Sequence, residues 1–461
     1  MRAMMGHAPT RLAPGIRLRQ ERFGGLVFDP RRGTTLEVDT PGFAALWRLR
    51  SGEAAVLDGA FAGRLLGLGI LEEGEPRVQA VAPPLPAACR HPWLSAPETV
   101  HWAVTYRCGM DCPDCYAARL QPHGEELDTA GALKLVDRIA GWGVFQLALG
   151  GGEPLAREDI AELAHHAAAG GLVVHLTTGR WDVPDRQLLA LSGGVRAMQF
   201  GVHADLFQTP RWTDYLRGLA DMRHAAAAFG MITGANLCLS RSVQGNFDAL
   251  ADALLGVGFE RLTLLRYKPP TTIRRWEEEA PEPEQLLALK PALDKLATRP
   301  GLGLRLDCAL SFLQNGLPPE VAAAHGIVGC AAANRIAAVA PDGSLYPCSQ
   351  LVDPNFRAGN LLAKPPDHLW HCAPALQRHR RFRKAGSFRR SPCGKCRASA
   401  ACGGCRVFAH DARGGDPGCP EPLPKHSRYP GEFPDEWFEA SYPKWLAPPD
   451  DEYDENDDIP F

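Results

Sequence analysis

The hydrophobic pattern between residues 98 and 299 alternates between short apolar runs and longer amphipathic segments. The runs have the length of buried strands, whereas segments such as Asp128–Ala140 and Arg157–Ala169 repeat apolar residues at helical spacing. Strands that alternate with helices are typical of parallel βαβ units. Six runs therefore predict an α/β fold with a partial (β/α)6 barrel, whose chemistry lies at the carboxyl ends of the strands. The expected strands are Val100–Tyr106, Val144–Leu149, Leu172–Thr177, Ala197–Val202, Ile232–Leu239 and Arg261–Tyr267.

The first 80 residues have a different pattern, in which three short strands precede helices. Asp39-Thr40-Pro41 places proline after a capping residue, which is typical of the start of a helix. The leucines between Leu65 and Leu71 indicate a further amphipathic segment. We interpret residues 1–80 as a small separate module. Its expected strands are Ile16–Glu21, Leu26–Asp29 and Thr34–Val38.

The remaining parts of the chain are set apart by composition. Prolines crowd the stretch before the barrel, which is typical of a linker, and after the barrel cysteines replace the strand–helix alternation. Between Gly431 and Phe461 there are 11 acidic residues, which indicates a disordered solubilising tail or a docking segment for a basic partner. The expected divisions are the module 1–80, a linker 81–97, the barrel 98–299, a cysteine-rich domain 300–425 and an acidic tail 426–461.

Composition and charge exclude several classes of protein. The 461 residues are 45% hydrophobic, and 50 Lys and Arg against 53 Asp and Glu give a net charge of -3, unlike a strongly basic nucleic-acid binder. No apolar run reaches the ~18 residues of a membrane span, and no signal peptide is visible. We therefore expect a cytoplasmic protein without nucleic-acid or membrane partners. Disulfides are rare in that compartment, so the 14 cysteines point to metal.

The first cysteine cluster follows the first expected barrel strand. Cys108, Cys112 and Cys115 lie within eight residues. A structural zinc site has four protein ligands, so three thiolates leave one position open for another ligand. Closely spaced thiolates also suit an iron–sulfur cluster. Zinc binding or a disulfide is the alternative for these residues.

This Cys-x3-Cys-x2-Cys motif resembles that of the radical S-adenosylmethionine (SAM) superfamily. The resemblance implies that the three catalytic thiolates hold a 4Fe–4S cluster, and that SAM chelates its fourth iron. A second matching motif follows the second strand, and its glycines allow close approach of the backbone to a ligand. It implies that Gly151, Gly152, Glu153 and Pro154 bind the cofactor, with Glu153 pairing with the SAM ammonium. Taken alone, this second motif would fit a plain turn between strand and helix.

The chain departs from the family pattern at two places. Asp114 stands where an aromatic residue or histidine is common, and Gly201–Ala204 replaces the usual Ser-x-Asp-Gly. We assign no SAM contact at either place. Thr178, Ser240 and Arg241 end later strands and are candidate cofactor contacts. Ordinary polar residues at strand ends are the equal alternative.

The second cysteine group resembles that of the SPASM domain, which is appended to many peptide-modifying radical SAM enzymes. The resemblance implies two auxiliary 4Fe–4S clusters. One would use Cys330, Cys348 and Cys405, with Cys308 as the fourth ligand or with that position open, and the other would use Cys393, Cys396, Cys402 and Cys419. The family run ends in Cys-x3-Cys, whereas only two residues separate Cys402 and Cys405, which leaves the sharing of ligands open. A zinc ribbon is the alternative, since paired Cys-x2-Cys motifs also bind zinc.

The three remaining cysteines fit no ligand pattern. Cys89, Cys238 and Cys372 are expected to be small buried hydrophobic residues. Cys238 lies on an expected core strand, so a role as hydrogen-atom donor is the alternative for it.

The amino-terminal module resembles the RiPP recognition element, a winged-helix module related to the peptide chaperone of pyrroloquinoline quinone biosynthesis. RiPPs are ribosomally made, post-translationally modified peptides. The match lies in the order of strands and helices, in Phe23–Val27 and in Thr40–Gly42. It implies that the module binds the leader of a precursor peptide as an extra strand at its sheet edge. An unrelated capping subdomain is the alternative.

Together the three resemblances imply a radical SAM enzyme that installs an oxidative carbon–carbon or thioether cross-link on a precursor peptide. The implied cofactors are SAM and three 4Fe–4S clusters, and the implied partners are the precursor and an external reductant such as flavodoxin or ferredoxin. One alternative is a formylglycine-generating or quinone-cofactor maturase. The other is a non-enzymatic zinc-binding peptide adaptor.

Overall fold

The structure is a computed structural model that describes most of the chain before residue 381. The described residues are 10–75, 77–78, 91–120, 124–268, 273–314, 329–380, 402, 404–405 and 407–408. The chain divides into two compact units, residues 1–95 and 96–461. Over the described ranges, no helix is both long and apolar enough to span a bilayer. Cys89, Cys393, Cys396, Cys419 and the acidic tail lie outside the described residues.

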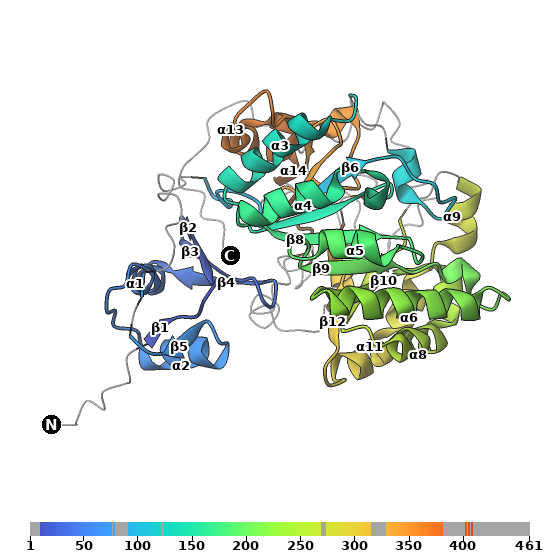
Figure 1. The fold of residues 1–461 in the computed structure, drawn as a ribbon, viewed down its shortest axis with the longest axis horizontal. Helices are drawn as coiled ribbons and strands as arrows, with labels where there is room; N and C mark the ends of the chain where they lie inside the picture. Colours follow the sequence, from blue (N-terminus) through green and yellow to red (C-terminus); the bar gives the residue numbers. More distant parts are fainter. Residues whose placement is uncertain are drawn as a thin grey trace. The chain divides into compact units, whose positions relative to one another are not determined.

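The second unit is built on a ten-stranded sheet with the order β12-β11-β10-β9-β8-β7-β6-β13-β14-β15 (Figure 1). From β6 to β12 all neighbouring strands are parallel. The six predicted barrel strands are confirmed, and a seventh, β12, extends the row beyond the predicted six. The seven strands are β6 (Thr99–Thr105), β7 (Gln146–Gly151), β8 (Val173–Thr178), β9 (Ala197–Gly201), β10 (Ile232–Leu239), β11 (Arg261–Arg266) and β12 (Gly303–Leu306).

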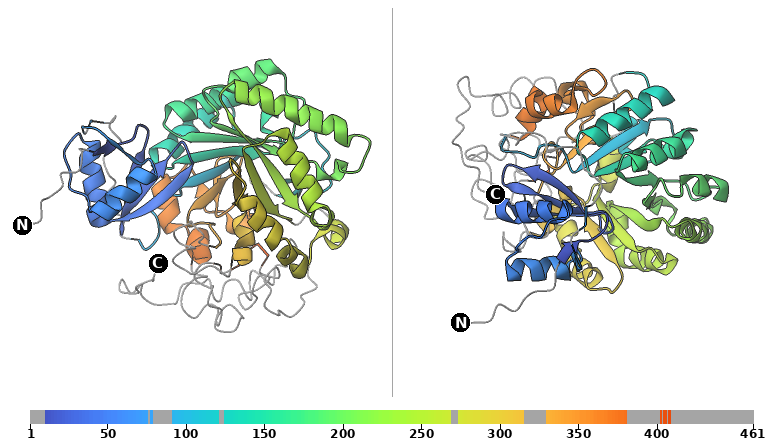
Figure 2. Two further views of the ribbon diagram at one scale, coloured as in Figure 1. Left: turned by 90° about the horizontal axis from the view of Figure 1, so that it is seen from below. Right: turned by 60° about the vertical axis from the view of Figure 1, so that its left-hand side comes forward.

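Helices cover the outer face of this parallel sheet, whose strands fan out in an arc (Figure 2). Helix α3 begins after Asp128, whose carboxylate accepts a hydrogen bond of 2.8 Å from the amide of Gly131. Its residues Ala132, Leu135, Val136 and Ile139 share one face and are buried. The covering helices are α3 (Thr129–Gly141), α4 (Ile160–Ala169), α5 (Asp185–Leu191), α6 (Trp212–Ala228), α7 (Arg241–Gly245) and α8 (Phe247–Val257).

Three short helices separate the last two barrel strands, β11 and β12. They are α9 (Ile273–Glu279), α10 (Pro283–Ala288) and α11 (Lys290–Ala297). The chain then passes through β12 into the 3-10 helix η4 (Cys308–Gln314). Cys308 therefore lies at the carboxyl end of the barrel sheet, immediately after Asp307.

The cysteine-rich part continues the barrel sheet. Strand β13 (Ile336–Val339) pairs in parallel with β6, and β14 (Ser344–Tyr346) and β15 (Gly359–Asn360) follow in antiparallel order. Gly343 has φ +81° in the turn between β13 and β14, a conformation that favours glycine. Two short helices complete this part, α13 (Pro366–Cys372) and α14 (Pro374–Arg380).

The first unit contains a three-stranded antiparallel sheet with the order β2-β3-β4. Its strands β2 (Arg17–Glu21), β3 (Gly24–Asp29) and β4 (Thr34–Asp39) confirm the three predicted ones. Helix α1 (Thr40–Arg50) begins as predicted, since the carboxylate of Asp39 accepts a hydrogen bond of 2.9 Å from the amide of Gly42. Leu18, Val27, Phe43 and Leu65 form part of the core.

The segment that includes Leu71 differs from the prediction of one continuous amphipathic stretch. Helix α2 spans Gly59–Gly67, and Gly69 with φ +66° turns the chain away from the helix. Leu71 then belongs to β5 (Leu71–Glu73), which pairs with β1 (Thr10–Leu12).

Candidate active site

The first cysteine cluster lies on the loop that follows β6, at the carboxyl end of the sheet. Cys108 is exposed, while Cys112 and Cys115 are partly buried. The pKa of the Cys112 thiol is raised to about 11, chiefly by burial and also by negative charge on Cys115 and Cys108. The three sulfurs are therefore near neighbours, and a bound cationic centre would offset the cost of ionising them.

A single metal ion and a multi-iron cluster require different arrangements of ligands in this loop. Within the described part of the chain, no three His, Cys, Asp or Glu side chains are arranged to bind one common ion. A multi-iron cluster makes a different demand, because each thiolate bonds a different iron atom. The thiolate-only donor set and its spacing fit such a cluster.

The glycine motif after β7 lies directly against the start of the cysteine loop. The amide of Gly152 donates to the carbonyl of Thr105 at 2.8 Å, and the amide of Glu153 donates to the carbonyl of Arg107 at 3.0 Å. A Cβ atom on Gly151 would lie 2.2 Å from the Thr105 carbonyl oxygen, and one on Gly152 would lie 2.5 Å from that of Arg107. Glycine is therefore required at both positions for the two backbones to approach.

Glu153 joins the carboxyl ends of β7 and β8. Its side chain is buried and accepts hydrogen bonds from the amide of Leu155 (3.0 Å), the hydroxyl of Thr178 (2.9 Å) and the amide of Gly179 (3.0 Å). Burial raises the pKa of Glu153, and these hydrogen bonds partly offset the effect. A carboxylate offers about four acceptor positions, so the carboxylate retains room for one more donor. Its contact with the SAM ammonium stays a prediction.

Pro154 and Thr178 have structural partners of their own. Pro154 is buried and opens the 3-10 helix η2 (Pro154–Ala156). The Thr178 hydroxyl, which donates to Glu153, also accepts from the amide of Arg180 at 3.0 Å. Cofactor binding by these two residues also stays a prediction.

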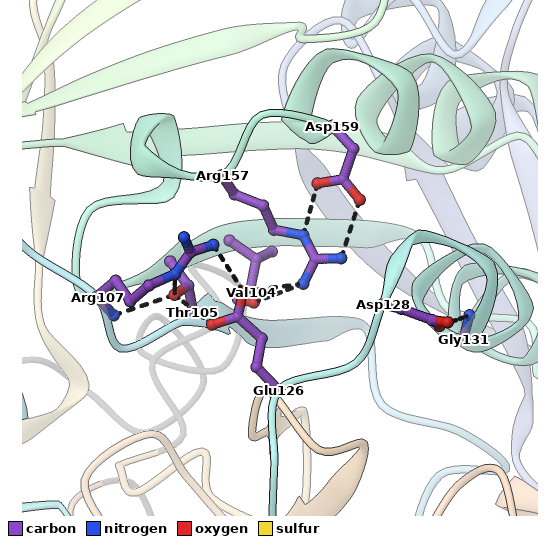
Figure 3. A network of polar contacts seen from close by, with 8 residues as sticks. All are labelled: Val104, Thr105, Arg107, Glu126, Asp128, Gly131, Arg157 and Asp159. Atoms are coloured by element: carbon purple, nitrogen blue, oxygen red, sulfur yellow. Dashed lines mark hydrogen bonds and ion pairs between the residues drawn. The ribbon is translucent and has the colours of Figure 1, made fainter.

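A polar network that the sequence did not reveal lies at the start of the cysteine loop and includes Thr105 and Arg107 (Figure 3). Arg157 is buried and donates to both oxygens of Asp159 (2.7 and 2.9 Å) and to the carbonyl of Val104 (3.1 Å). It also lies 3.4 Å from Glu126, which binds Arg107 at 3.0 Å. The network links the end of β6 to the segment that follows the glycine motif. The only sequence signal for it was the position of Arg157 three residues after Pro154.

His203 lies beside the cysteine loop, although the sequence gave it no role. Its Nε2 is 2.8 Å from the carbonyl oxygen of Gly179, and its backbone amide donates to the hydroxyl of Tyr215 at 2.9 Å. A Cβ atom on Gly179 would lie only 2.8 Å from the methyl carbon of Met110, so the cysteine loop packs on this residue. The ends of β6, β8 and β9 thus meet at one place.

Ser240 and Arg241 are held by neighbouring elements. The Ser240 hydroxyl caps α7 by accepting from the amide of Val243 at 3.3 Å. Arg241 donates to the carbonyl of Ala280 at 2.9 Å and lies 3.6 Å from Glu282. Their predicted contacts with SAM remain predictions.

Asp114, which replaces an aromatic residue of the family pattern, ties the cysteine loop to the end of the barrel. Its carboxylate accepts two hydrogen bonds from Arg275 of α9, at 2.7 and 2.9 Å, and one of 2.7 Å from the hydroxyl of Tyr267. The Tyr267 ring stacks on Trp276, with 5.7 Å between ring centroids. The sequence pointed to Asp114 only as a departure and did not reveal these partners.

Four cysteines of the second group gather in one place. The thiol of Cys308 accepts a hydrogen bond from the amide of Ala331, next to Cys330. Cys330 and Cys405 belong to one buried cluster, and Cys348 packs against it. Burial raises the pKa of Cys308, as do the charges of Asp307, Cys330 and Cys405. These four residues are the ones predicted to bind one auxiliary cluster, and their binding of a cluster stays a prediction.

The cysteines outside this set have varied surroundings. Cys402 is buried, and the hydroxyl of Ser311 lies 3.5 Å from its sulfur. Cys238 lies on β10, and burial raises its pKa to about 12. The prediction of a buried Cys372 is wrong, because α13 buries Leu369 and Trp370 and leaves Cys372 exposed.

Helix α14 supports the loop that carries Cys330. The Nε2 atom of His379 lies 3.8 Å from the Cys330 sulfur, and His379 is buried. Arg380 donates to the carbonyl of Ala333 at 2.6 Å, and its guanidinium stacks over the ring of Trp370 at 4.2 Å. The sequence gave no sign of either residue, since both depend on tertiary contacts.

Two models of known families match parts of the chain. Residues 102–219 match the model of the radical SAM superfamily, and residues 330–402 match that of the SPASM iron–sulfur cluster-binding domain. The first match includes Cys108, Cys112 and Cys115, and the second begins at Cys330.

Known proteins with similar sequences include a peptide cyclase and a maturase. The PqqA peptide cyclase of Methylobacterium sp. (strain 4-46) is 28% identical over 345 residues, which cover 71% of this chain and 87% of that protein. The mycofactocin maturase MftC of Mycobacterium ulcerans (strain Agy99) is 27% identical over 322 residues, covering 68% of this chain and 84% of that protein.

A solved structure shares the fold. Streptococcus suis SuiB bound to its precursor peptide SuiA superposes with a TM-score of 0.63 at 16% sequence identity, covering 86% of this chain and 95% of SuiB. At this identity the likeness concerns the fold.

Proposed function

We propose that this chain, a radical SAM enzyme with a SPASM domain, installs an oxidative carbon–carbon or thioether cross-link on a ribosomally made precursor peptide. The observation that carries the proposal is the meeting of the Cys108–Cys115 loop and the glycine motif at the carboxyl end of a parallel half-barrel. Proteins of similar sequence include ones named as a peptide cyclase and a maturase. The zinc-binding adaptor has no such support.

In this proposal Cys108, Cys112 and Cys115 would hold a 4Fe–4S cluster with SAM at its open iron. When bound, this pair supplies reductive cleavage of SAM and a carbon-centred radical that abstracts hydrogen from the peptide. The protein's own contribution is to bind and orient. Gly151 and Gly152 allow the glycine motif to pack against the backbone at the start of the cysteine loop. Glu153 then binds this motif to the end of β8.

The grouping of Cys308, Cys330, Cys348 and Cys405 supports an auxiliary cluster with four thiolates. A link to the first cysteine loop is present, because the hydroxyl of Tyr116 is hydrogen-bonded to the side chain of Ser349, next to Cys348. An auxiliary cluster at this place would accept an electron from a peptide radical, so the net change in the peptide is an oxidation. An external reductant such as flavodoxin or ferredoxin would start each cycle.

The first unit would bind the leader of the precursor. Its sheet order leaves β4 without a further strand beside it among the described residues. On the other side of the sheet, Glu21 of β2 accepts a hydrogen bond of 2.8 Å from the amide of Ser95, so the chain that follows the module lies near β2. The edge of β4 is therefore the favoured place for an added strand.

The test is anaerobic reconstitution followed by incubation with SAM, dithionite and candidate precursor peptides encoded near this chain. We expect 5′-deoxyadenosine together with a peptide that has lost hydrogen and gained a cross-link, detected by tandem mass spectrometry. Product without loss of hydrogen would disprove the oxidative step, and a colourless zinc protein would disprove the whole proposal.

A further inference from the structure

An ion pair lies buried where the barrel meets the second cysteine group. Lys268 follows β11 and Asp307 follows β12, and these strands are parallel neighbours whose carboxyl ends meet. The ammonium of Lys268 pairs with the carboxylate of Asp307, and each side chain is only 13% exposed. Removing two charges from water is costly, so a buried pair needs further hydrogen bonds to persist.

Asp307 has these further hydrogen bonds. Its carboxylate also accepts from the amide of Arg266 at 3.3 Å and from the amide of Ala309 at 3.0 Å. Arg266 in turn donates to the carbonyl of Ala309 at 3.2 Å, and its guanidinium lies 3.7 Å from the ring centroid of Phe408. The backbone on both sides of Cys308 is thus held by the end of β11.

Several thiols lie close enough to the ion pair to interact with its charges. Lys268 interacts electrostatically with Cys308 and Cys405, and its charge also acts on Cys348. On the barrel side it acts on Cys238 and on the hydroxyl of Tyr116. The net charge of this pair is zero, so either partner alone would leave a full charge beside the cysteines.

We propose that the Lys268–Asp307 ion pair is a positioning device for the auxiliary centre, which holds Cys308 beside Cys330, Cys348 and Cys405 as the fourth thiolate. Because its two charges cancel, the pair adds no net charge beside that centre, and loss of either partner would shift the reduction potential. This inference rests on the proposed function, because it requires a cluster at these cysteines.

The charge argument predicts opposite shifts from the two single variants. Lys268→Met leaves the Asp307 carboxylate, which disfavours the reduced cluster, whereas Asp307→Asn leaves the ammonium, which favours it. We expect each variant to change the ratio of oxidised to reduced cluster about tenfold at a fixed potential, or about 59 mV for a one-electron couple. The double variant restores neutrality and should lie near the wild type.

The experiment compares wild type, Lys268→Met, Asp307→Asn, the double variant and Lys290→Met. Lys290 is the matched control, because it pairs with Asp294 on the surface. Iron and sulfide are counted, the auxiliary centre is titrated by electron paramagnetic resonance, and SAM cleavage without peptide reports on the first centre. We expect opposite shifts in potential, or loss of iron from the auxiliary centre alone, with SAM cleavage retained.

Four outcomes would contradict the inference or the function on which it rests. Full iron with equal potentials in every protein would overturn the inference, as would shifts of the two single variants in the same direction. Loss of iron from both centres, the double variant included, would also overturn it, because the pair would then support the fold as a whole. Zinc in place of iron in the wild-type protein would instead overturn the proposed function.

Discussion

The amide of Gly152 donates a hydrogen bond of 2.8 Å to the carbonyl of Thr105, three residues before the first cysteine of the loop. A methyl group on Gly152 would lie 2.5 Å from the Arg107 carbonyl oxygen and 2.8 Å from the carbonyl carbon of Tyr106. These neighbours are backbone atoms, so they can move only if the cysteine loop moves. The glycine motif therefore acts on the cysteine loop even before any cofactor binds.

Gly152→Ala should displace the loop at a cost of about 1–3 kcal/mol, the usual range for overpacking. We expect loss of the first cluster and a fall of at least about tenfold in 5′-deoxyadenosine formation, since about 1.4 kcal/mol is a factor of ten. Gly150→Ala is the matched control, because nothing lies within 4 Å of a Cβ atom there. Iron content and the visible spectrum without SAM are the measurements. Equal iron in the two variants would contradict the steric argument.

Much of the barrel was predictable because its strands are apolar runs. Strands β6 to β11 carry buried residues at regular positions, as Val100, Trp102 and Val104 show in β6. Strand β12 was missed because it is only four residues long and follows three short helices. The pairing of β13 with β6 was also missed, since strand order depends on contacts far apart in the chain.

The candidate site was predictable where chemistry follows local spacing. Cys108, Cys112 and Cys115 lie close together in sequence, as do the residues of the glycine motif, so each motif is visible there. The pairing of Asp114 with Arg275 spans 161 residues and arises from the topology of the barrel. His379 beside Cys330 is of the same kind.

Cys112→Ala should abolish SAM cleavage while leaving auxiliary iron in place. Cys112 lies between the other two thiols in sequence and interacts with both, so its loss leaves only two ligands for the first cluster. The measurement is 5′-deoxyadenosine after reduction with dithionite, together with iron per chain. Product at the wild-type level would show that this loop does not hold the catalytic cluster.

Cys396→Ala and Cys402→Ala should separate auxiliary clusters from zinc. Each variant should lose about four iron atoms per chain, the content of one 4Fe–4S cluster. SAM cleavage should persist, because the first cysteine loop is unchanged, while the peptide product should disappear. Full iron content with stoichiometric zinc in both variants would exclude the second auxiliary cluster.

Arg275→Met should weaken the link between the cysteine loop and α9. The side chains of Arg275 and Asp114 are 27% and 29% exposed, so solvent weakens their interaction. Losing this ion pair should therefore cost about 1 kcal/mol at most, which is up to about fivefold in SAM affinity. Arg274→Met is the control, since the Arg274 side chain is 88% exposed and pairs with Glu278. Isothermal titration with SAM distinguishes the two. If Arg274→Met lowered the affinity for SAM more than Arg275→Met does, the proposed role of the Arg275–Asp114 pair would be contradicted.

The amino-terminal unit can be tested by removing it. Deleting residues 1–74 should weaken binding of the precursor and leave SAM cleavage without peptide largely intact, because the barrel belongs to the other compact unit. Gly25→Ala is a subtler variant, because a Cβ atom there would lie 2.0 Å from the Phe43 ring in the core of the unit. This variant should reduce leader binding while leaving the second unit, and its SAM cleavage without peptide, unchanged.

The physical reason for this prediction is that a tethered leader raises the concentration of the core peptide at the active site. Loss of the tether should therefore raise the apparent KM for the peptide far more than it changes the rate of uncoupled SAM cleavage. Adding the excised unit in trans should restore little activity, because no linker then holds it near the barrel. Fluorescence anisotropy of a labelled leader, titrated with full-length and truncated protein, measures the difference directly. Equal affinity for the two proteins would show that the leader is bound by the second unit.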